Sequence, residues 1–164
     1  MGTCLSYGAT CTKSTKLIEF QFQRLHRRIP TNDFLRKGRK ENDNCTFCNN
    51  SSETLIHLFW SCHVSSSFKK SVTDWLQNAL PLIGKYNLLN ISALRLRPEP
   101  HSTEYSRQLN YCTLLARFHI WKGKMDEISP NFANFLHLVK SRSIIEKKAG
   151  DTKKMELSYR LLLI

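Results

Sequence analysis

The 164-residue sequence predicts an all-α fold. Apolar side chains recur every three or four residues in several long segments, which is the period of an amphipathic helix. Serine, threonine, proline and glycine stand where those segments begin and end, as they do at helix termini. A cluster of cysteine and histidine lies among these segments: Cys45, Cys48, His57 and Cys62. These observations predict a small helical domain organised around that cluster, followed by a C-terminal helical segment.

The first helix is expected to begin near Ser14, because residues 1–13 are small, polar and without periodicity and are therefore expected to be disordered. Pro30 ends this helix, since the residue before a proline is driven out of the helical conformation. Its apolar face would consist of Leu17, Phe20 and Leu25, with Ile29 as a further candidate.

A short helix is predicted over residues 32–37, with Thr31 as its N-cap and Gly38 just after its end. The apolar run Leu55–Trp60 is predicted to be a second helix, starting near Ser52.

A longer helix over residues 64–79 follows and is stopped by Pro81. Residues 82–96 are ambiguous between a loop, a short helix and a short strand, and residues 97–102 form a linker with two prolines. The apolar residues of the longer helix are Val64, Phe68, Val72, Trp75 and Leu76. The linker predicts a boundary between a cysteine-containing domain over 14–96 and a helical region over 103–164.

Helical periodicity resumes near Thr103. Its common face contains Leu109, Cys112, Leu115, Ala116, His119 and Ile120. A last long helix is expected from Pro130 to about Lys148, with Ser129 as its N-cap and proline at the first helical position. Its apolar residues are Phe132, Phe135, Leu136, Val139 and Ile144.

The cysteine and histidine cluster has the spacing C-x2-C-x8-H-x4-C. Two thiolates separated by two residues can both face one ion at about 2.3 Å, in the tight turn that zinc sites use. Three cysteines and one histidine complete a tetrahedron around Zn2+ and leave no position open for substrate, which indicates a structural site. Because the spacing from His57 to Cys62 slightly exceeds one helical turn, we expect a kink or loop near Ser61 if both residues bind.

Two other interpretations of the cluster stay open. The Cys45–Cys48 pair by itself is also typical of redox pairs, although no strand–helix–strand context surrounds it. His63 follows Cys62 directly and is an alternative fourth ligand. The remaining cysteines are predicted to be free thiols, the last of them in the core: Cys4, Cys11 and Cys112.

The charge is strongly basic, with 25 Lys and Arg against 13 Asp and Glu and a net charge of +12. Such a surplus favours an anionic partner, most often nucleic acid. Residues 13–40 hold nine basic and two acidic residues, a local +7, whereas residues 41–63 hold three acids and no Lys or Arg. The predicted phosphate contacts are Arg24, Arg27, Arg28, Arg36, Lys37, Arg39 and Lys40. The alternative is a solvated helical face, which is the preferred interpretation of a second basic cluster at 140–154.

Three aromatic residues near the cluster are candidates for base stacking or for core packing. Phe59 is expected in the core, whereas Phe47 and Trp60 fit either role.

No apolar run reaches the roughly 18 residues of a membrane span, and the first twelve residues lack the features of a secretory signal. We therefore expect a reducing compartment, cytoplasmic or nuclear, in which six cysteines do not form a disulfide framework. The opening MGTCLS fits the pattern for myristoylation of Gly2, but the pattern is short and common by chance, so no membrane partner is expected.

The residues around the cluster resemble the zinc-binding region that follows the reverse transcriptase domain in LINE-type, non-LTR retrotransposon polyproteins. The matching residues are Leu25-His26-Arg27, Pro30-Thr31, Cys45, Cys48, Glu53-Thr54, and His57-Leu58-Phe59 leading to Cys62. The stretch FHIWKGKMDEISPNFANFLHLVKSRSIIEK extends the resemblance to roughly residues 16–148. Two departures, Lys69 after Phe68 in place of the family's usual aromatic and a compressed approach to Cys45, suggest a decayed or truncated copy.

This resemblance implies binding to element RNA or target DNA during target-primed reverse transcription, with a reverse transcriptase core domain as a candidate partner. It implies no catalysis, because the chain has neither the polymerase Tyr/Phe-x-Asp-Asp motif nor a recognisable endonuclease set. A zinc deaminase would need His-x-Glu with Pro-Cys-x-x-Cys, and both are missing. The alternative function is a structural or protein-interaction module in which zinc holds helices together without nucleic-acid binding.

Overall fold

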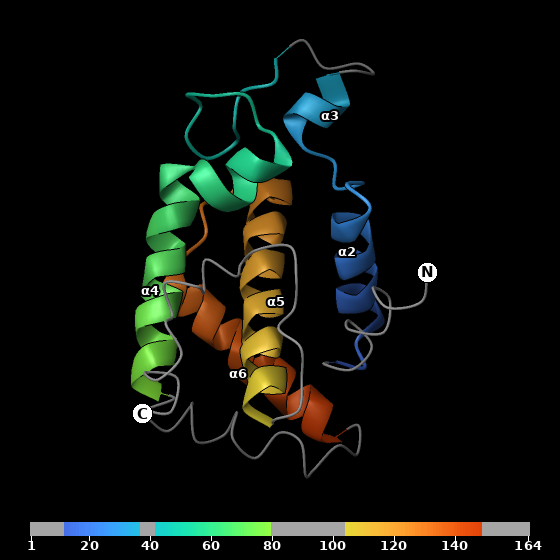
Figure 1. The fold of residues 1–164 in the computed structure, drawn as a ribbon, viewed down its shortest axis with the longest axis vertical. Coiled ribbons are helices and arrows are strands. Elements are labelled where there is room, and N and C mark those ends of the chain that lie inside the picture. The colour runs from blue at the N-terminus through green and yellow to red at the C-terminus, as the bar shows by residue number, and fades with distance from the viewer. Residues whose placement is uncertain (1–11, 37–41, 80–103, 149–164) are drawn as a thin grey trace.

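The computed structural model describes residues 12–36, 42–79 and 104–148 (Figure 1). These residues are mostly helical and contain no strand, only an isolated antiparallel bridge between Asn44 and Ser52. The prediction of an all-α fold is therefore confirmed. The helical elements are α2 (Thr15–Leu25), α3 (Asn32–Arg36), the π-helical turn η1 (His57–Ser61), α4 (His63–Ala79), α5 (Glu104–Met125) and α6 (Phe132–Lys148).

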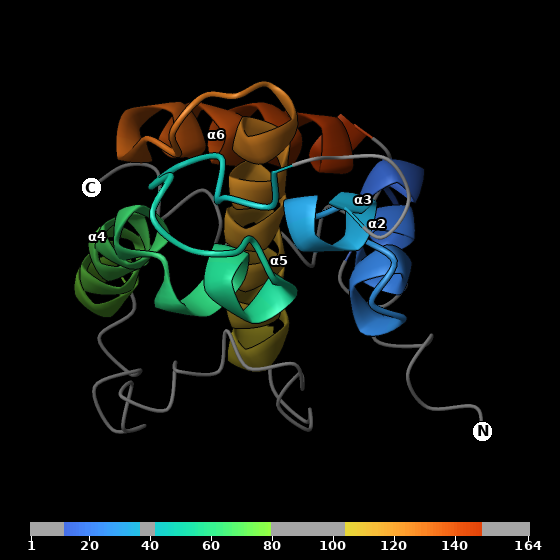
Figure 2. The same ribbon diagram turned by 90° about the horizontal axis from the view of Figure 1, so that it is seen from above.

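Helix α5 lies at the centre of the arrangement. Helices α2 and α4 flank it on opposite sides, and α6 crosses it (Figure 1), so that seen from above α6 covers one face of the group (Figure 2). The turn η1 contacts both α4 and α5, and it lies with α3 at the C-terminal end of α5. The cysteine loop is therefore placed on one end of a helical bundle.

The sequence of α5 explains its central position. Every residue from Tyr111 to Phe118 is buried, which means that this helix is covered on all sides rather than along one stripe. Leu115 and Ile120 have no exposed surface, and Cys112 is 3% exposed, as predicted.

Aromatic side chains fix how the outer helices sit on the core. The ring of Phe20 on α2 lies 5.5 Å from that of Phe118 and 5.3 Å from that of Trp121, measured between centroids. On the other side, the ring of Phe135 on α6 meets Phe68 edge-on at 5.6 Å and Trp75 at 5.9 Å. Such edge-to-face pairs add about 0.5–1.5 kcal/mol each beyond the area that they bury.

The segments on either side of the predicted linker share one hydrophobic core. Leu17 and Phe20 from α2 belong to the same buried cluster as Phe135 and Val139 from α6. The linker itself, the ambiguous segment 82–96 and the lead-in up to residue 11 lie outside the described residues. The two predicted regions are therefore packed together, and the boundary between them stays a prediction.

Helix α3 begins as its sequence predicts. The hydroxyl oxygen of Thr31 accepts a hydrogen bond from the backbone N–H of Phe34 at 3.4 Å, which is N-cap geometry. The helix ends at Arg36, and the predicted closing residues Lys37 and Gly38 lie outside the described residues.

Helix α6 differs from the prediction at its start and along its face. Its N-cap is Asn131 rather than Ser129, because the Asn131 side-chain oxygen accepts the backbone N–H groups of Ala133 (2.8 Å) and Asn134 (3.3 Å). A tight reversal after α5, closed by the hydrogen bond from the Ile128 N–H to the Gly123 carbonyl (2.8 Å), takes up the intervening residues.

The apolar face of α6 is also shorter than its pattern suggests. Ile144 is 50% exposed, whereas its neighbour Ser143 has no exposed surface. The buried residues of α6 follow one stripe with i, i+4 spacing, Phe135, Val139 and Ser143, so a serine occupies the last core position and Ile144 lies beside the stripe.

Candidate metal centre

The four predicted ligands converge on one point. One ligand atom from each of Cys45, Cys48, His57 and Cys62 lies within 4.8 Å of the others. The Sγ atoms of Cys45 and Cys62 are 3.9 Å apart, and the Cys48 Sγ is 3.2 Å from the His57 Nε2. Two sulfurs bound tetrahedrally to Zn2+ at about 2.3 Å would lie about 3.8 Å apart, so the spacing fits a Cys3His zinc site.

A short, hydrogen-bonded loop presents the first two thiols. The Cys45 N–H donates to the Ser51 carbonyl (2.8 Å), and the Asn49 N–H donates to the Cys45 carbonyl (2.8 Å), which closes the turn around Cys48. Asn49 adopts a positive φ of 53°, in the left-handed region that asparagine tolerates better than most residues. The turn therefore directs both sulfurs inward.

The other two ligands lie at the two ends of a wide helical turn. The Cys62 N–H donates to the His57 carbonyl at 2.9 Å, an i to i+5 bond that defines a π-helix. A turn of this width absorbs the extra residue in the His-x4-Cys spacing, so His57 and Cys62 face the same side. The predicted kink or loop near Ser61 is therefore a π-helical turn, followed by the extended backbone of Cys62 (ψ 126°).

The helical segment before His57 starts later than expected. Thr54, rather than Ser52, caps it, since its hydroxyl oxygen accepts the His57 N–H at 3.0 Å and its carbonyl accepts the Leu58 N–H at 2.9 Å. Ser52 is instead held in the isolated bridge and donates its hydroxyl hydrogen to Asp43 at 2.9 Å.

A buried carboxylate ties the metal loop to the rest of the fold. Glu53 has no exposed surface, and its two oxygens accept the backbone N–H groups of Asn32 (3.0 Å) and Thr46 (2.6 Å). Lys124 at the end of α5 pairs with it at 3.7 Å and also donates to the Pro30 carbonyl at 2.6 Å. The chain before α3, the cysteine loop and α5 therefore meet at one buried ion pair.

Sequence reasoning missed this pair. In the sequence, Glu53 is one of the three acids of residues 41–63 and part of the family resemblance, and no motif includes Lys124. The neighbours of an acid in the sequence do not reveal that it is buried when its partner lies on a distant helix. The one sequence signal for a structural role of Glu53 is its position just before the helical turn that carries His57.

Burial and hydrogen bonding shift the pKa values of two of the clustered thiols in opposite directions. Burial raises the pKa of Cys45 to about 12, against the opposing effect of the Cys48 and Phe47 backbone N–H groups. At Cys48 burial also acts to raise the pKa, but hydrogen bonds from the Asn50 backbone and the other cysteines outweigh it, and the pKa is lowered. Zinc must displace the Cys45 proton, so binding releases protons and weakens as the pH falls.

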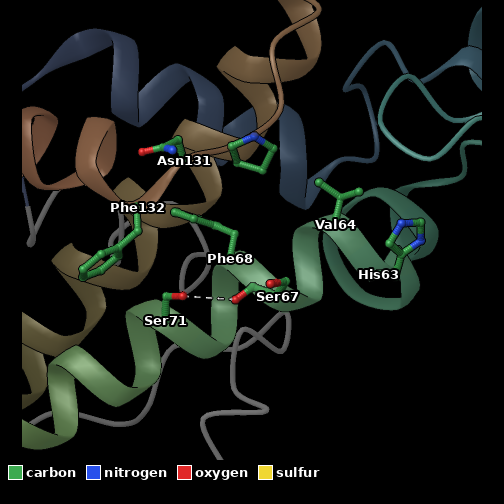
Figure 3. A pocket seen from close by; sticks show the side chains of 8 residues that line it. His63, Val64, Ser67, Phe68, Ser71, Asn131 and Phe132 are labelled. Atoms are coloured by element: carbon green, nitrogen blue, oxygen red, sulfur yellow. Dashed lines mark hydrogen bonds between the residues drawn. The ribbon is translucent and has the colours of Figure 1, made fainter.

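The alternative ligand and the remaining described cysteine lie elsewhere. His63 is exposed and borders an open cavity of about 420 Å³ between α4 and the start of α6, with Phe68 and Phe132 in its lining (Figure 3). It is outside the four-residue cluster, so His57 is the histidine that faces the thiols. Burial raises the pKa of Cys112 to about 12, which keeps this thiol unreactive.

Phe47 and Trp60, the two aromatic residues that fit either base stacking or core packing, lie in different environments. Phe47 is partly buried and packs against the core, as Phe59 does. Trp60 is 40% exposed on η1.

The predicted phosphate contacts occupy different environments. Arg27 and Arg28 are exposed on the link between α2 and α3, and Arg36 is exposed but pairs with Asp33 (3.9 Å) and Asp43 (3.5 Å). Lys37, Arg39 and Lys40 lie outside the described residues.

The expectation that Arg24 presents its charge at the surface is corrected. It is 4% exposed because it lies on the same face of α2 as Leu17 and Phe20, and its Nε donates to Gln21 at 3.2 Å. Burial lowers its pKa to about 10. Helical spacing places position 24 on the core side, which the count of basic residues does not reveal.

Among the described helices, none combines the length and apolar character that crossing a bilayer requires.

A comparison with known protein families supports the interpretation of the cluster as a zinc site. Residues 10–68 match the family described as zinc-binding in reverse transcriptase, a zinc-binding region and not a polymerase or nuclease domain. No curated protein and no solved structure matched the chain. The match contains all four ligands, and their geometry is that of a Cys3His zinc site. Residues 10–68 therefore match a zinc-binding domain associated with reverse transcriptases, and the Cys3His cluster within them indicates Zn2+ as the metal.

Proposed function

We propose that this chain is a nucleic-acid-binding module of the kind found at the C-terminus of non-LTR retrotransposon reverse transcriptases. In it, zinc fixes the fold, and arginines beside the metal loop contact the phosphates of element RNA or target DNA. The module has no catalysis of its own. The observation that carries the proposal is the placement of Arg27 and Arg28.

These two arginines are exposed on the link between α2 and α3, and the residues that follow them are held in place by burial and by a hydrogen bond. Arg27 takes a positive φ of 53° directly after α2, which turns the chain away from the helix axis. Ile29, next in sequence, has no exposed surface, and the Pro30 carbonyl accepts the hydrogen bond from Lys124 at 2.6 Å. Cations held on such a rigid link lose little freedom on binding a phosphate, which favours affinity.

The link is also coupled to the metal loop. The Asn32 side-chain amide donates to the Asn44 carbonyl (2.6 Å) and to Thr46 (3.3 Å), and the Asn32 N–H donates to Glu53. Zinc binding and arginine placement therefore depend on the same contacts.

The distribution of charge indicates that phosphate would contact the link between α2 and α3 rather than the metal loop. Three thiolates and one divalent ion leave a net charge of −1 at the metal, which repels phosphate. The Glu53 carboxylate is neutralised by Lys124, and Arg36 is partly neutralised by Asp33 and Asp43. Arg27 and Arg28 have no carboxylate partner among the described ion pairs.

A salt titration of nucleic-acid binding tests the proposal. We expect the zinc-loaded chain to bind single-stranded RNA and duplex DNA at low salt, with little sequence preference. Each phosphate contact contributes about 0.9 to the slope of log K against log salt on duplex DNA, so Arg27→Gln with Arg28→Gln should lower that slope by about 1.8.

The matched control removes the same charge elsewhere. Lys70 and Lys140 are exposed on α4 and α6, and Lys70→Gln with Lys140→Gln should leave most of the affinity intact. If both double variants lost the same affinity for nucleic acid, the loss would follow from net charge alone, and this result would contradict a binding site at the link. A folded, zinc-loaded chain that binds neither nucleic acid at low salt would exclude the proposal.

A second candidate function is docking to another protein, such as a reverse transcriptase core. It is favoured by apolar side chains left exposed in the zinc-binding region, among them Ile56 (70%) and Phe34 (50%). In that case Ile56→Ser would abolish association with the partner, while Arg27→Gln with Arg28→Gln would change nothing that involves nucleic acid.

A further inference from the structure

Lys69 reaches back from α4 to η1, the turn that lies between two of the metal ligands. It lies two helical turns after Cys62, yet its Nζ donates to the Trp60 carbonyl at 2.9 Å and lies 4.7 Å from the centre of the Trp60 ring. Both contacts belong to η1, the turn that carries His57 and leads directly into Cys62. The ammonium group, although partly exposed, is thus held on the turn that joins His57 to Cys62.

The metal centre needs a positive charge nearby. Zn2+ with three thiolates and a neutral imidazole carries a net charge of −1, and Cys62 contributes its share while fully buried (0% exposed). A buried negative charge is costly unless a cation or hydrogen-bond donors compensate it. Other described cations at this end of the bundle are already paired: Lys124 with Glu53, Arg36 with Asp33 and Asp43, and Lys122 with Asp126.

We infer that Lys69 is the outer counter-charge of the zinc–thiolate centre and that it strengthens zinc binding while restraining the reactivity of the Cys62 sulfur. Two features support this role. The Trp60 ring and carbonyl fix the ammonium in place, so the charge acts from a defined position. In addition, the backbone of Cys62 joins η1 to the helix that carries Lys69, because its N–H donates to the His57 carbonyl at 2.9 Å and its carbonyl accepts the Ser66 N–H at 2.8 Å.

The chemical consequence concerns the electron density on sulfur. A nearby cation stabilises a thiolate and makes it less basic, and a less basic thiolate attacks electrophiles more slowly. Without Lys69, the net negative charge of the zinc centre would lose this compensating cation, and zinc would be bound less tightly. The same sulfurs would react faster with alkylating reagents, and zinc would be released when an S–C bond replaces the S–Zn bond.

The experiment compares four variants with the full-length zinc-loaded chain. Zinc affinity is measured by competition with a chelator, and zinc release by N-ethylmaleimide is followed with a metal-sensitive dye. Lys69→Met removes the charge, Lys69→Gln removes the charge but keeps a hydrogen-bond donor, Lys69→Arg keeps the charge, and Lys70→Met removes an exposed neighbouring charge. Circular dichroism checks that each variant is folded.

Groups outside the first ligand shell typically change metal affinity 10- to 100-fold, and we expect the low end here, about 10-fold weaker zinc binding in Lys69→Met and Lys69→Gln. Both should also release zinc several-fold faster, whereas Lys69→Arg and Lys70→Met should match the parent chain. Parent-like behaviour of Lys69→Gln would overturn the inference. So would an equal loss in Lys69→Arg, because that would show a purely structural role for the lysine side chain.

Discussion

Glu53 illustrates at the scale of a single residue how the metal loop is held. It is a carboxylate without exposed surface, and it accepts two backbone N–H groups while pairing with Lys124. A buried ion pair adds little to stability compared with apolar residues of the same size, but it is costly to break. Its role is therefore best understood as fixing the positions of three segments relative to one another.

Replacing Glu53 with glutamine should destabilise the chain strongly. The change leaves Lys124, which is 8% exposed, with its hydrogen bond to the Pro30 carbonyl but without a carboxylate to balance its charge, and removing one partner of such a pair costs about 3–5 kcal/mol. The free energy of unfolding, measured by urea denaturation at saturating zinc, should fall accordingly. Asp74→Asn, a similar change at an exposed position of α4, is the control and should have almost no effect.

A loss below about 1 kcal/mol, in the range of exposed ion pairs, would contradict this account of Glu53. It would mean that Lys124 finds solvent or another acceptor once the carboxylate is gone.

At the scale of elements, the sequence predicts helices well where one face is apolar. Leu17 and Phe20 in α2, and Phe68, Val72 and Leu76 in α4, are all buried as their spacing predicts. The CxxC turn and its partners were predictable for a different reason, because metal coordination restricts the residue types and their spacing to a few combinations.

The same reasoning fails where packing between elements decides the outcome. Ile144 is expected on the apolar face of α6 but is 50% exposed, since the buried stripe continues from Phe135 and Val139 to Ser143, a polar residue that the apolar pattern does not mark as core. Arg24 was counted as a surface charge although its helical position puts it in the core. The π-helical form of η1 follows from two ligands sharing one ion, which no local propensity indicates.

His119 on α5 lies where three elements meet, and it should make stability depend on pH. Its ring lies 5.3 Å from that of Phe68 and 6.1 Å from that of Phe135, and its Nε2 lies 3.1 Å from the Asn131 carbonyl. Burial lowers its pKa below the ordinary value of 6.5, against the opposing effect of the Asn131 carbonyl. The unfolded chain therefore binds this proton more readily than the folded chain does.

The sign of the effect follows from this difference. The stability associated with neutral His119 is fully present above about pH 6.5 and is lost as the pH falls from there through the folded pKa. Urea unfolding between pH 7.5 and 5.5 should show a steeper loss in the parent chain than in His119→Gln. Comparing the two chains cancels the titration of the zinc ligands, and parallel curves would contradict the assignment.

For the whole molecule, the family match and the folded unit have different extents. The match ends at residue 68, but the core that supports it is completed by α5 and α6. Phe20 packs on Phe118 and Trp121, and Lys124 closes the ion pair with Glu53. The zinc-binding region and the C-terminal helices therefore share one hydrophobic core among the described residues.

The central claim is that one zinc ion, bound by Cys45, Cys48, His57 and Cys62, organises this end of the molecule. Metal analysis of the purified chain, together with its thermal unfolding before and after chelation, tests it most directly. The account predicts one zinc per chain, a large drop in the unfolding midpoint on removing it, and loss of zinc in Cys48→Ser but not in Cys112→Ala. A metal-free chain whose helical signal and unfolding midpoint do not respond to added zinc would contradict the account.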